Sequence, residues 1–386
     1  MKTNPWPARW AGLLLMIGLV LGLTACTDAN NEAAACDTPQ AVTFVVGAHA
    51  NTPAPVLQPQ AECVARNVMN AGGQVLVVSA EGIPVSVDVP LEPLSGTDTE
   101  RNDVMDNNVV MINAVISSIT PTSPQLDTLE AIAVAADLSR AHSVPHALIW
   151  VLDSGLSSTG VLDFAHTPGL LGAAPSEITA QLAQASELPN LDGMSVTLSL
   201  GYTTGPQPDL GDANRTRLYD IYTDVLTASG ANVTLAPFPV HGAAVSTDQP
   251  VDITDIPAPT PKKITEPVDV AFTEQNSQVR FVANTAEYLY KDAAISDLTP
   301  VAQYLKADGS RHAAMVATTA RVGDKDGQIT LSNKRCQTVT NTLVDLGAAP
   351  EQISCEGLGS YSTYYQPDDN NPAAKAANRA IHVTLT

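Results

Sequence analysis

Aromatic residues and positive charges are scarce in this 386-residue sequence. Phe, Trp and Tyr make up 4% of the chain, and 19 basic residues stand against 40 acidic ones, for a formal net charge of -21. Such an acidic surface repels the phosphates of nucleic acids and the headgroups of anionic lipids. The balance argues against a nucleic-acid partner and against charge-driven membrane binding. A hydrophobic fraction of 44% still supports folded domains, and the length allows two of them.

The sequence also lacks the local motifs of the common enzyme classes. It has no G-x-S-x-G, no H-E-x-x-H, no Walker loop and no G-x-G-x-x-G after a strand. Its seven histidines are scattered, and Pro145 argues against His142 and His146 sharing one helical face. We therefore predict a protein that is not an enzyme and that needs no cofactor and no metal ion.

The apolar run at the N-terminus is too short for a comfortable membrane span. Ala11–Leu23 falls below the ~20 residues that a spanning helix needs, and Lys2 and Arg9 precede it. The run ends in L-T-A-C at Cys26, which resembles the lipobox of bacterial lipoproteins. The resemblance implies a signal peptide over residues 1–25 and a membrane anchor of acyl chains, palmitate among them, on Cys26. An ordinary secretory signal with a chance cysteine is the alternative.

The other cysteines are few, and none forms a C-x-x-C pair. In an exported protein the four of them could form disulfides in three ways. They fall into two local pairs at opposite ends of the chain. We therefore predict the disulfides Cys36–Cys63 and Cys336–Cys355, and no zinc or thiol redox site.

Strand and helix patterns alternate between residues 41 and 241, after a small, polar tether at 26–40. The helical pattern Asp127–Ala141 has Asp127 as its expected N-cap and Glu130 at the capping-box position. The alternation predicts an α/β domain with a doubly wound, mostly parallel sheet. The expected strands are Ala41–Ala48, Gln74–Ser79, Ala147–Leu152, Ser195–Leu200 and Asn232–Ala236, with Ile83–Val89 as an edge strand.

The order of these elements loosely resembles a von Willebrand factor A domain. That family binds a divalent cation through Asp-x-Ser-x-Ser after its first strand, whereas this chain has G-A-H-A-N ending at Asn51. Asp153 does follow the Ala147–Leu152 strand, and it could either contribute to a cation site or simply hydrogen-bond a turn. Ligands of doubly wound sheets bind at the carboxyl ends of the strands. A pocket there for a small ligand, a peptide or a protein partner is a further possibility.

Residues 242–268 are rich in proline, threonine and aspartate. The P-A-P-T-P core favours an extended, semi-rigid conformation. We interpret this segment as the linker between two domains, 41–241 and 269–386.

The segment Met315–Val339 carries the most specific pattern in the chain. An apolar strand ends in T-T-A at Ala320, Gly323 follows, and L-S-N-K-R-C opens an expected helix, Leu331–Leu346, that carries Arg335. This pattern, with I-S-C-E-G-L-G at Ile353–Gly359 and N-R-A-I-H-V from Asn378, resembles the OmpA-like domains of OmpA, Pal and MotB. The resemblance implies an α+β domain with β-α-β-α-β-β order in two layers, opening with a strand at Val279–Phe281.

The resemblance also implies a binding site for the peptidoglycan stem peptide. In that family an aspartate after the strand pairs with the ammonium of diaminopimelate, and the helix arginine binds its carboxylate. The corresponding positions here are Ala320 and Arg335, with Thr319 before the first and Asp324 in the following loop as a substitute acid. A surface or structural ion pair is the alternative role for Arg335.

These features predict a cell-envelope lipoprotein, exposed outside the cytoplasm, that contacts peptidoglycan through its C-terminal domain. The alternative is a lipoprotein that binds a protein or a small ligand and whose C-terminal domain has lost peptidoglycan binding. Ala320 is the reason for the alternative prediction, because it removes one half of the expected charge pair.

Overall fold

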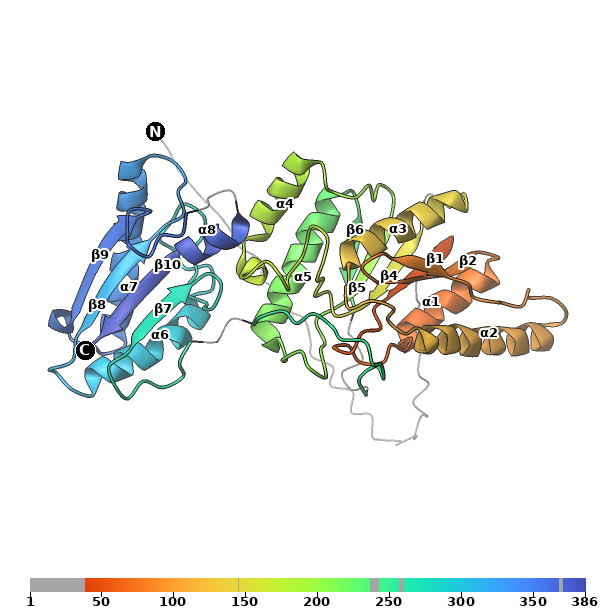
Figure 1. The fold of residues 1–386 in the computed structure, drawn as a ribbon, viewed down its shortest axis with the longest axis horizontal. Helices are drawn as coiled ribbons and strands as arrows, with labels where there is room; N and C mark the ends of the chain where they lie inside the picture. Colours follow the sequence, from red (N-terminus) through yellow and green to blue (C-terminus); the bar gives the residue numbers. More distant parts are fainter. Residues whose placement is uncertain (1–38, 145, 237–242, 257–259, 368–370) are drawn as a thin grey trace, which may run out of the picture. The chain divides into compact units, whose positions relative to one another are not determined.

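The chain folds into a mixed α/β structure with two sheets, seen here in a computed structural model (Figure 1). The structure describes residues 39–144, 146–236, 243–256, 260–367 and 371–386. Within these ranges, no helix combines the length and apolar character that a membrane span requires. The predicted signal peptide, Cys26, the tether up to residue 38 and part of the predicted linker lie outside the described residues.

The first sheet is mostly parallel and has the strand order β3-β2-β1-β4-β5-β6. All neighbouring pairs run parallel except β2 and β3, so the short β3 is an antiparallel edge strand, as its alternating sequence predicts. The strands are β1 (Ala41–Val46), β2 (Gln74–Ser79), β3 (Val85–Val87), β4 (Leu148–Leu152), β5 (Ser195–Ser199) and β6 (Asn232–Leu235).

Helices pack on both faces of this sheet. Side chains of β1 alternate between two apolar clusters: Phe44 packs with α1 and α2, while Val45 packs with α3, α4 and α5. Both side chains are fully buried, which explains the continuous apolar runs in the sequence. The helices are α1 (Pro59–Asn70), α2 (Asp98–Ser118), α3 (Thr128–Ala141), α4 (Pro175–Ala185) and α5 (Gly211–Ala228).

The helix caps differ in one respect from the prediction. Asp127 does cap α3, accepting a hydrogen bond from the Glu130 backbone, but Glu130 makes no return bond. The reciprocal capping box lies instead at the start of α2, where Thr97 and Glu100 bond each other's backbone.

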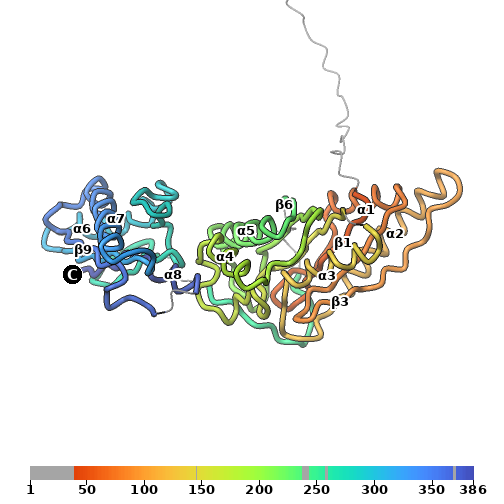
Figure 2. Tube along the Cα trace, turned by 90° about the horizontal axis from the view of Figure 1, so that it is seen from above, coloured from red at the N-terminus to blue at the C-terminus, as the bar shows by residue number. Residues whose placement is uncertain are grey.

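The second sheet has four strands in the order β7-β10-β8-β9. Only β8 and β9 run parallel, and α6 and α7 pack side by side against the sheet to enclose one core (Figure 2). The elements are β7 (Asp269–Thr273), α6 (Lys291–Lys306), β8 (Ala313–Thr318), α7 (Lys325–Asp345), β9 (Ile353–Gly359), α8 (Pro372–Asn378) and β10 (Ala380–Leu385).

Three expectations for this region are wrong. The first strand is β7 and not Val279–Phe281, because Val270 and Phe272 bury one face of β7 while Phe281 makes only an isolated bridge to Tyr288. A short helix, α8, precedes the last strand, which gives a β-α-β-α-β-α-β order. Helix α7 begins at Lys325, well before the expected Leu331, because Asp324 caps it by accepting from the backbone of Gly327.

A disulfide joins α7 to β9. Cys336 and Cys355 are bonded with their Cα atoms 5.7 Å apart, which confirms that predicted pair. Cys63 is also disulfide-bonded. Its predicted partner, Cys36, lies outside the described residues.

Removing the Cys336–Cys355 bond should destabilise the four-stranded region. A loop of 19 residues is expected to contribute ~3 kcal/mol through the entropy of the unfolded chain. The measurement is chemical denaturation of the Cys336→Ala/Cys355→Ala double variant, followed by the fluorescence or circular dichroism of the full chain. The double variant leaves Cys63 bonded, so it isolates this bond better than a reductant does. An unchanged midpoint would contradict the expectation.

Asp127 should make the protein less stable as the pH rises. Burial raises the pKa of this carboxyl to about 6, whereas an unfolded aspartate titrates near pH 4. The folded state therefore favours the protonated form, and stability is lost as the pH rises from about 4 to 6. Asp127→Asn keeps the capping oxygen and should stabilise the protein by about 1–2 kcal/mol at pH 7 but not at pH 4. Equal effects of the substitution at both pH values would contradict this account.

Candidate functional site

A cavity of about 620 Å³ opens where β8 ends and α7 begins. The predicted site residues Thr319, Asp324 and Arg335 all line it, although they come from three different segments of the chain. The structure therefore places them around one cavity, while their roles as ligand contacts stay predictions. The other residues that concern its chemistry are Glu177, Glu274, Arg280, Phe281, Ala320, Gln328, Leu331 and Arg379.

The chain between β8 and α7 sets the shape of this cavity. Thr319 and Ala320 follow the last residue of β8 and are 4% exposed. Gly323 then adopts a φ of 77°, a left-handed conformation that L side chains rarely adopt. The turn it allows directs Asp324 into the N-cap position of α7.

Arg335 is a buried cation with free hydrogen-bonding capacity. It is 5% exposed, its Nε donates to the Thr285 carbonyl at 3.0 Å, and its guanidinium lies 4.8 Å from the centre of the Phe281 ring. Burial lowers the pKa of Arg335 to about 10, so it is still charged at neutral pH. Among the described residues its two terminal nitrogens have no carboxylate partner. Their planar fork matches a carboxylate ligand.

A second arginine of the cavity, Arg379, forms ion pairs with two glutamates. It pairs with Glu274 at 3.1 Å and with Glu177 at 3.0 Å. Burial by itself would lower the pKa of Arg379, but the bonds and charges of these two carboxylates outweigh it and raise the pKa above its usual value. Both glutamates thus have Arg379 as their direct partner, while the charge of Glu274 also raises the pKa of Arg335 and offsets part of the effect of burial.

Three buried polar atoms of the cavity wall have no partner within the described structure. They are Thr319 Oγ1, Gln328 Oε1 and Arg280 Nε. The amide of Gln328 is oriented by its nitrogen, which donates to the Gly323 carbonyl at 3.0 Å and leaves the oxygen free. Buried polar groups are rarely left without a hydrogen bond, so these atoms can bond a water molecule or a ligand.

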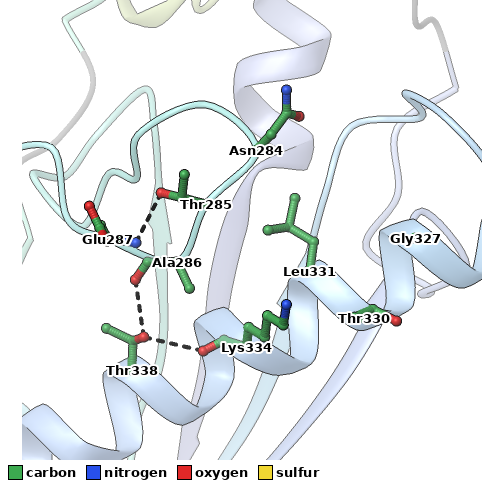
Figure 3. Close-up of a pocket in the computed structure, with 9 residues that line it drawn as sticks. All are labelled: Asn284, Thr285, Ala286, Glu287, Gly327, Thr330, Leu331, Lys334 and Thr338. Atoms are coloured by element: carbon green, nitrogen blue, oxygen red, sulfur yellow. Dashed lines mark hydrogen bonds between the residues drawn. The ribbon is translucent and has the colours of Figure 1, made fainter.

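A second cavity, of about 650 Å³, adjoins the first along α7 (Figure 3). The loop 284–287 lies over the helix there, held by Thr338 Oγ1, which donates to the Ala286 carbonyl at 3.0 Å. Together with the bond from Arg335 to Thr285, this contact fastens the loop to α7. Arg335 therefore has a structural contact as well as free donors.

Sequence reasoning missed Gln328, Arg280 and this loop. Gln328 stands seven residues before Arg335, so both lie on the same face of α7. A helix start at Lys325, signalled by Asp324 as an N-cap, would have revealed it. Arg280 carried no local signal, because its role depends on the folded loop.

The carboxyl ends of the first sheet hold a sealed polar cluster. Asp153 is fully buried and accepts hydrogen bonds from Thr128 Oγ1 and from the Ser154 backbone at 2.7 Å, and burial raises its pKa. These hydrogen bonds agree with the second role considered for Asp153, which is to hydrogen-bond a turn. In the described part of the chain, no three His, Cys, Asp or Glu side chains gather as metal ligands. Asn51, 1% exposed, has no partner for either side-chain polar atom.

Comparison with known proteins identifies part of the four-stranded region. Residues 280–379 match the model of the OmpA family. No match was found among curated proteins. The von Willebrand factor A resemblance receives no support from these comparisons and stays a prediction.

Several solved structures resemble about a third of the chain. They include the OmpA-like domain of FopA1 from Francisella tularensis subsp. tularensis (16% identity, 31% of this chain and 71% of that chain, TM-score 0.25). The periplasmic domain of Helicobacter pylori MotB has 14% identity over 32% of this chain and 78% of that one, with a TM-score of 0.27. The peptidoglycan-associated lipoprotein from Burkholderia pseudomallei has 24% identity over 31% and 89%, with a TM-score of 0.24.

The assignment thus depends on the family match, and its span contains the cavity wall from Arg280 to Arg379. No enzymatic family is indicated. Residues 280–379 of this chain are a domain of the OmpA family.

Proposed function

We propose that the chain is a cell-envelope lipoprotein whose OmpA domain holds peptidoglycan without a covalent bond. The OmpA match and the free guanidinium of Arg335 in a cavity with unpartnered polar atoms support this function. The proposed order is a signal peptide (1–25), a lipid on Cys26, a tether (26–40), an α/β domain (41–241), a linker (242–268) and an OmpA-like domain (269–386).

The buried guanidinium of Arg335, with its two terminal nitrogens free to donate, is the main support for this proposal. A stem peptide presents carboxylates, and the two terminal nitrogens of Arg335 can donate parallel hydrogen bonds to one of them. Because the site is shielded from water, such a pair is stronger than one on the surface. Thr319 Oγ1 is free to add a hydrogen bond next to it. The cavity wall carries three arginines and three acids, and Arg335 is the arginine whose terminal nitrogens can receive an anionic ligand.

Arg335→Ala should abolish sedimentation of the purified full chain with isolated sacculi. Loss of a desolvated partner of a charge pair costs about 2–5 kcal/mol, so binding should weaken by about 30-fold or more. Arg311→Ala is the matched control, since Arg311 also donates to a carbonyl, that of Tyr304 at 2.9 Å, and stacks on an aromatic ring, but lies outside the cavity. Circular dichroism checks that both variants are folded.

If the wild-type chain does not sediment with sacculi even at low salt, peptidoglycan binding is wrong. If Arg311→Ala and Arg335→Ala weaken binding equally, the cavity is not the binding site.

Asp324 allows a second test, because one substitution can remove its charge while keeping an N-capping oxygen. Asp324→Ser keeps an N-capping oxygen and removes the charge, whereas Asp324→Ala removes both. We expect Asp324→Ser to bind sacculi like wild type, since the carboxylate is already bonded to the Gly327 backbone at 2.8 Å. Asp324→Ala should lower the free energy of unfolding by about 1 kcal/mol. A large loss of binding in Asp324→Ser would instead make the carboxylate a ligand contact.

A second candidate function is recognition of a protein or small ligand by the six-stranded region. The unpartnered side chain of Asn51 at the carboxyl end of β1 favours it. So do exposed apolar side chains on α2, where Val110 is 69% exposed. In this reading the OmpA domain no longer binds peptidoglycan. Failure of the sacculus experiment above, with a folded wild-type chain, is the outcome that favours it.

A further inference from the structure

We infer that the cavity around Arg335 selects a carboxylate whose neighbouring nitrogen is acylated, in preference to one that carries a free ammonium. An acylated nitrogen is the form that a diamino acid takes once its stem peptide is cross-linked to another. The inference rests on the proposed function and names the form of the ligand that the same site prefers.

Each acidic residue of the cavity wall already has a bonding partner within the protein. In the described structure these residues are Glu177, Glu274 and Asp324. The two glutamates bind Arg379, and Asp324 caps α7. A ligand ammonium that entered beside Arg335 would therefore have to share a carboxylate that already has a partner.

Ala320 marks the position where an acid is missing. It lines the cavity, is 4% exposed and follows Thr319 directly after β8. Its methyl group can neither accept a hydrogen bond nor balance a charge. An ammonium placed against it would lose its water shell without compensation, and such a loss is costly. A neutral amide nitrogen loses far less.

The free acceptors of the wall are neutral, which suits an amide. Gln328 Oε1 and Thr319 Oγ1 are buried and have no partner among the described residues, and both residues line the same cavity as Arg335. An amide N–H needs one neutral acceptor and is fully satisfied by a carbonyl oxygen. Gln328 thus supplies for an acylated nitrogen what a carboxylate would supply for an ammonium.

Apolar side chains of the cavity offer a surface against which an acyl substituent can pack. Val322, Val282 and Leu289 are 57%, 38% and 43% exposed, and all three line the cavity together with Phe281 and Leu331. Exposed apolar side chains that converge on one opening gain from being covered. A free amine leaves them in water, whereas an acyl chain attached to that nitrogen can pack against them.

The test compares two ligands on the purified full chain. One is the tripeptide L-alanyl-γ-D-glutamyl-meso-diaminopimelate with its distal amine free, and the other is the same tripeptide acetylated on that amine. We expect isothermal titration calorimetry to show at least about tenfold tighter binding of the acetylated form. Equal affinities, or tighter binding of the free amine, would overturn the inference.

Two variants make the comparison sharper. Ala320→Asp supplies the missing charge and should reverse the preference in favour of the free amine. Ala320→Asn is its matched control, because it has nearly the same shape but no charge, and it should not favour the free amine. If Ala320→Asp leaves the preference unchanged, the position does not set selectivity. The wild-type comparison decides the inference even if neither variant folds.

The outcomes also separate this inference from the proposed function. A wild-type chain that binds neither tripeptide and no sacculi contradicts both. A wild-type chain that sediments with sacculi but binds the free-amine tripeptide at least as tightly contradicts the inference alone. Gln328→Leu gives an independent check, since it should weaken binding of the acetylated form and leave that of the free amine unchanged.

Discussion

The desolvation of Arg335 is the constraint around which the OmpA domain of this chain is arranged. A guanidinium that is 5% exposed must be stabilised by its surroundings, and here it has one carbonyl and one aromatic ring but no carboxylate. Such an arrangement is costly for a residue with only a structural role. A ligand carboxylate would complete it, and the proposed binding function rests on this incompleteness.

The elements around Arg335 serve to hold it in place. Asp324 starts α7 early, which gives the helix an extra turn and brings Gln328 onto the face that carries Arg335. The disulfide at Cys336, the next residue, fixes this part of α7 to β9. The loop 284–287 is bonded to the same helix through Arg335 and Thr338. The guanidinium is thereby oriented before any ligand arrives, which lowers the entropy cost of binding.

Charge pairing within the cavity then determines what kind of ligand suits it. Arg379 pairs with the two glutamates and Ala320 offers no acid, so among the described residues Arg335 has no carboxylate in direct contact, although the charge of Glu274 acts on it from further away. A zwitterionic ligand could pair its carboxylate with Arg335, but its ammonium would lack a counter-charge there. A singly charged carboxylate with a neutral nitrogen leaves no charge unpaired, and this is the physical link between one alanine and the preferred state of the ligand.

The sequence by itself determined the mixed α/β class, most strands of both sheets, the Cys336–Cys355 pair and the OmpA family, because apolar periodicity and the spacing around Arg335 are local features. It also exposed Ala320 as the departure from the expected site. Only the tertiary structure decided that β7 and not Val279–Phe281 opens the four-stranded sheet, since that depends on which side chains the core has room to bury. Likewise, the pairing of Arg379 with two glutamates and the free oxygen of Gln328 depend on residues distant in the chain. No local pattern encodes such contacts, because the energy of a buried charge is set by all the groups that surround it.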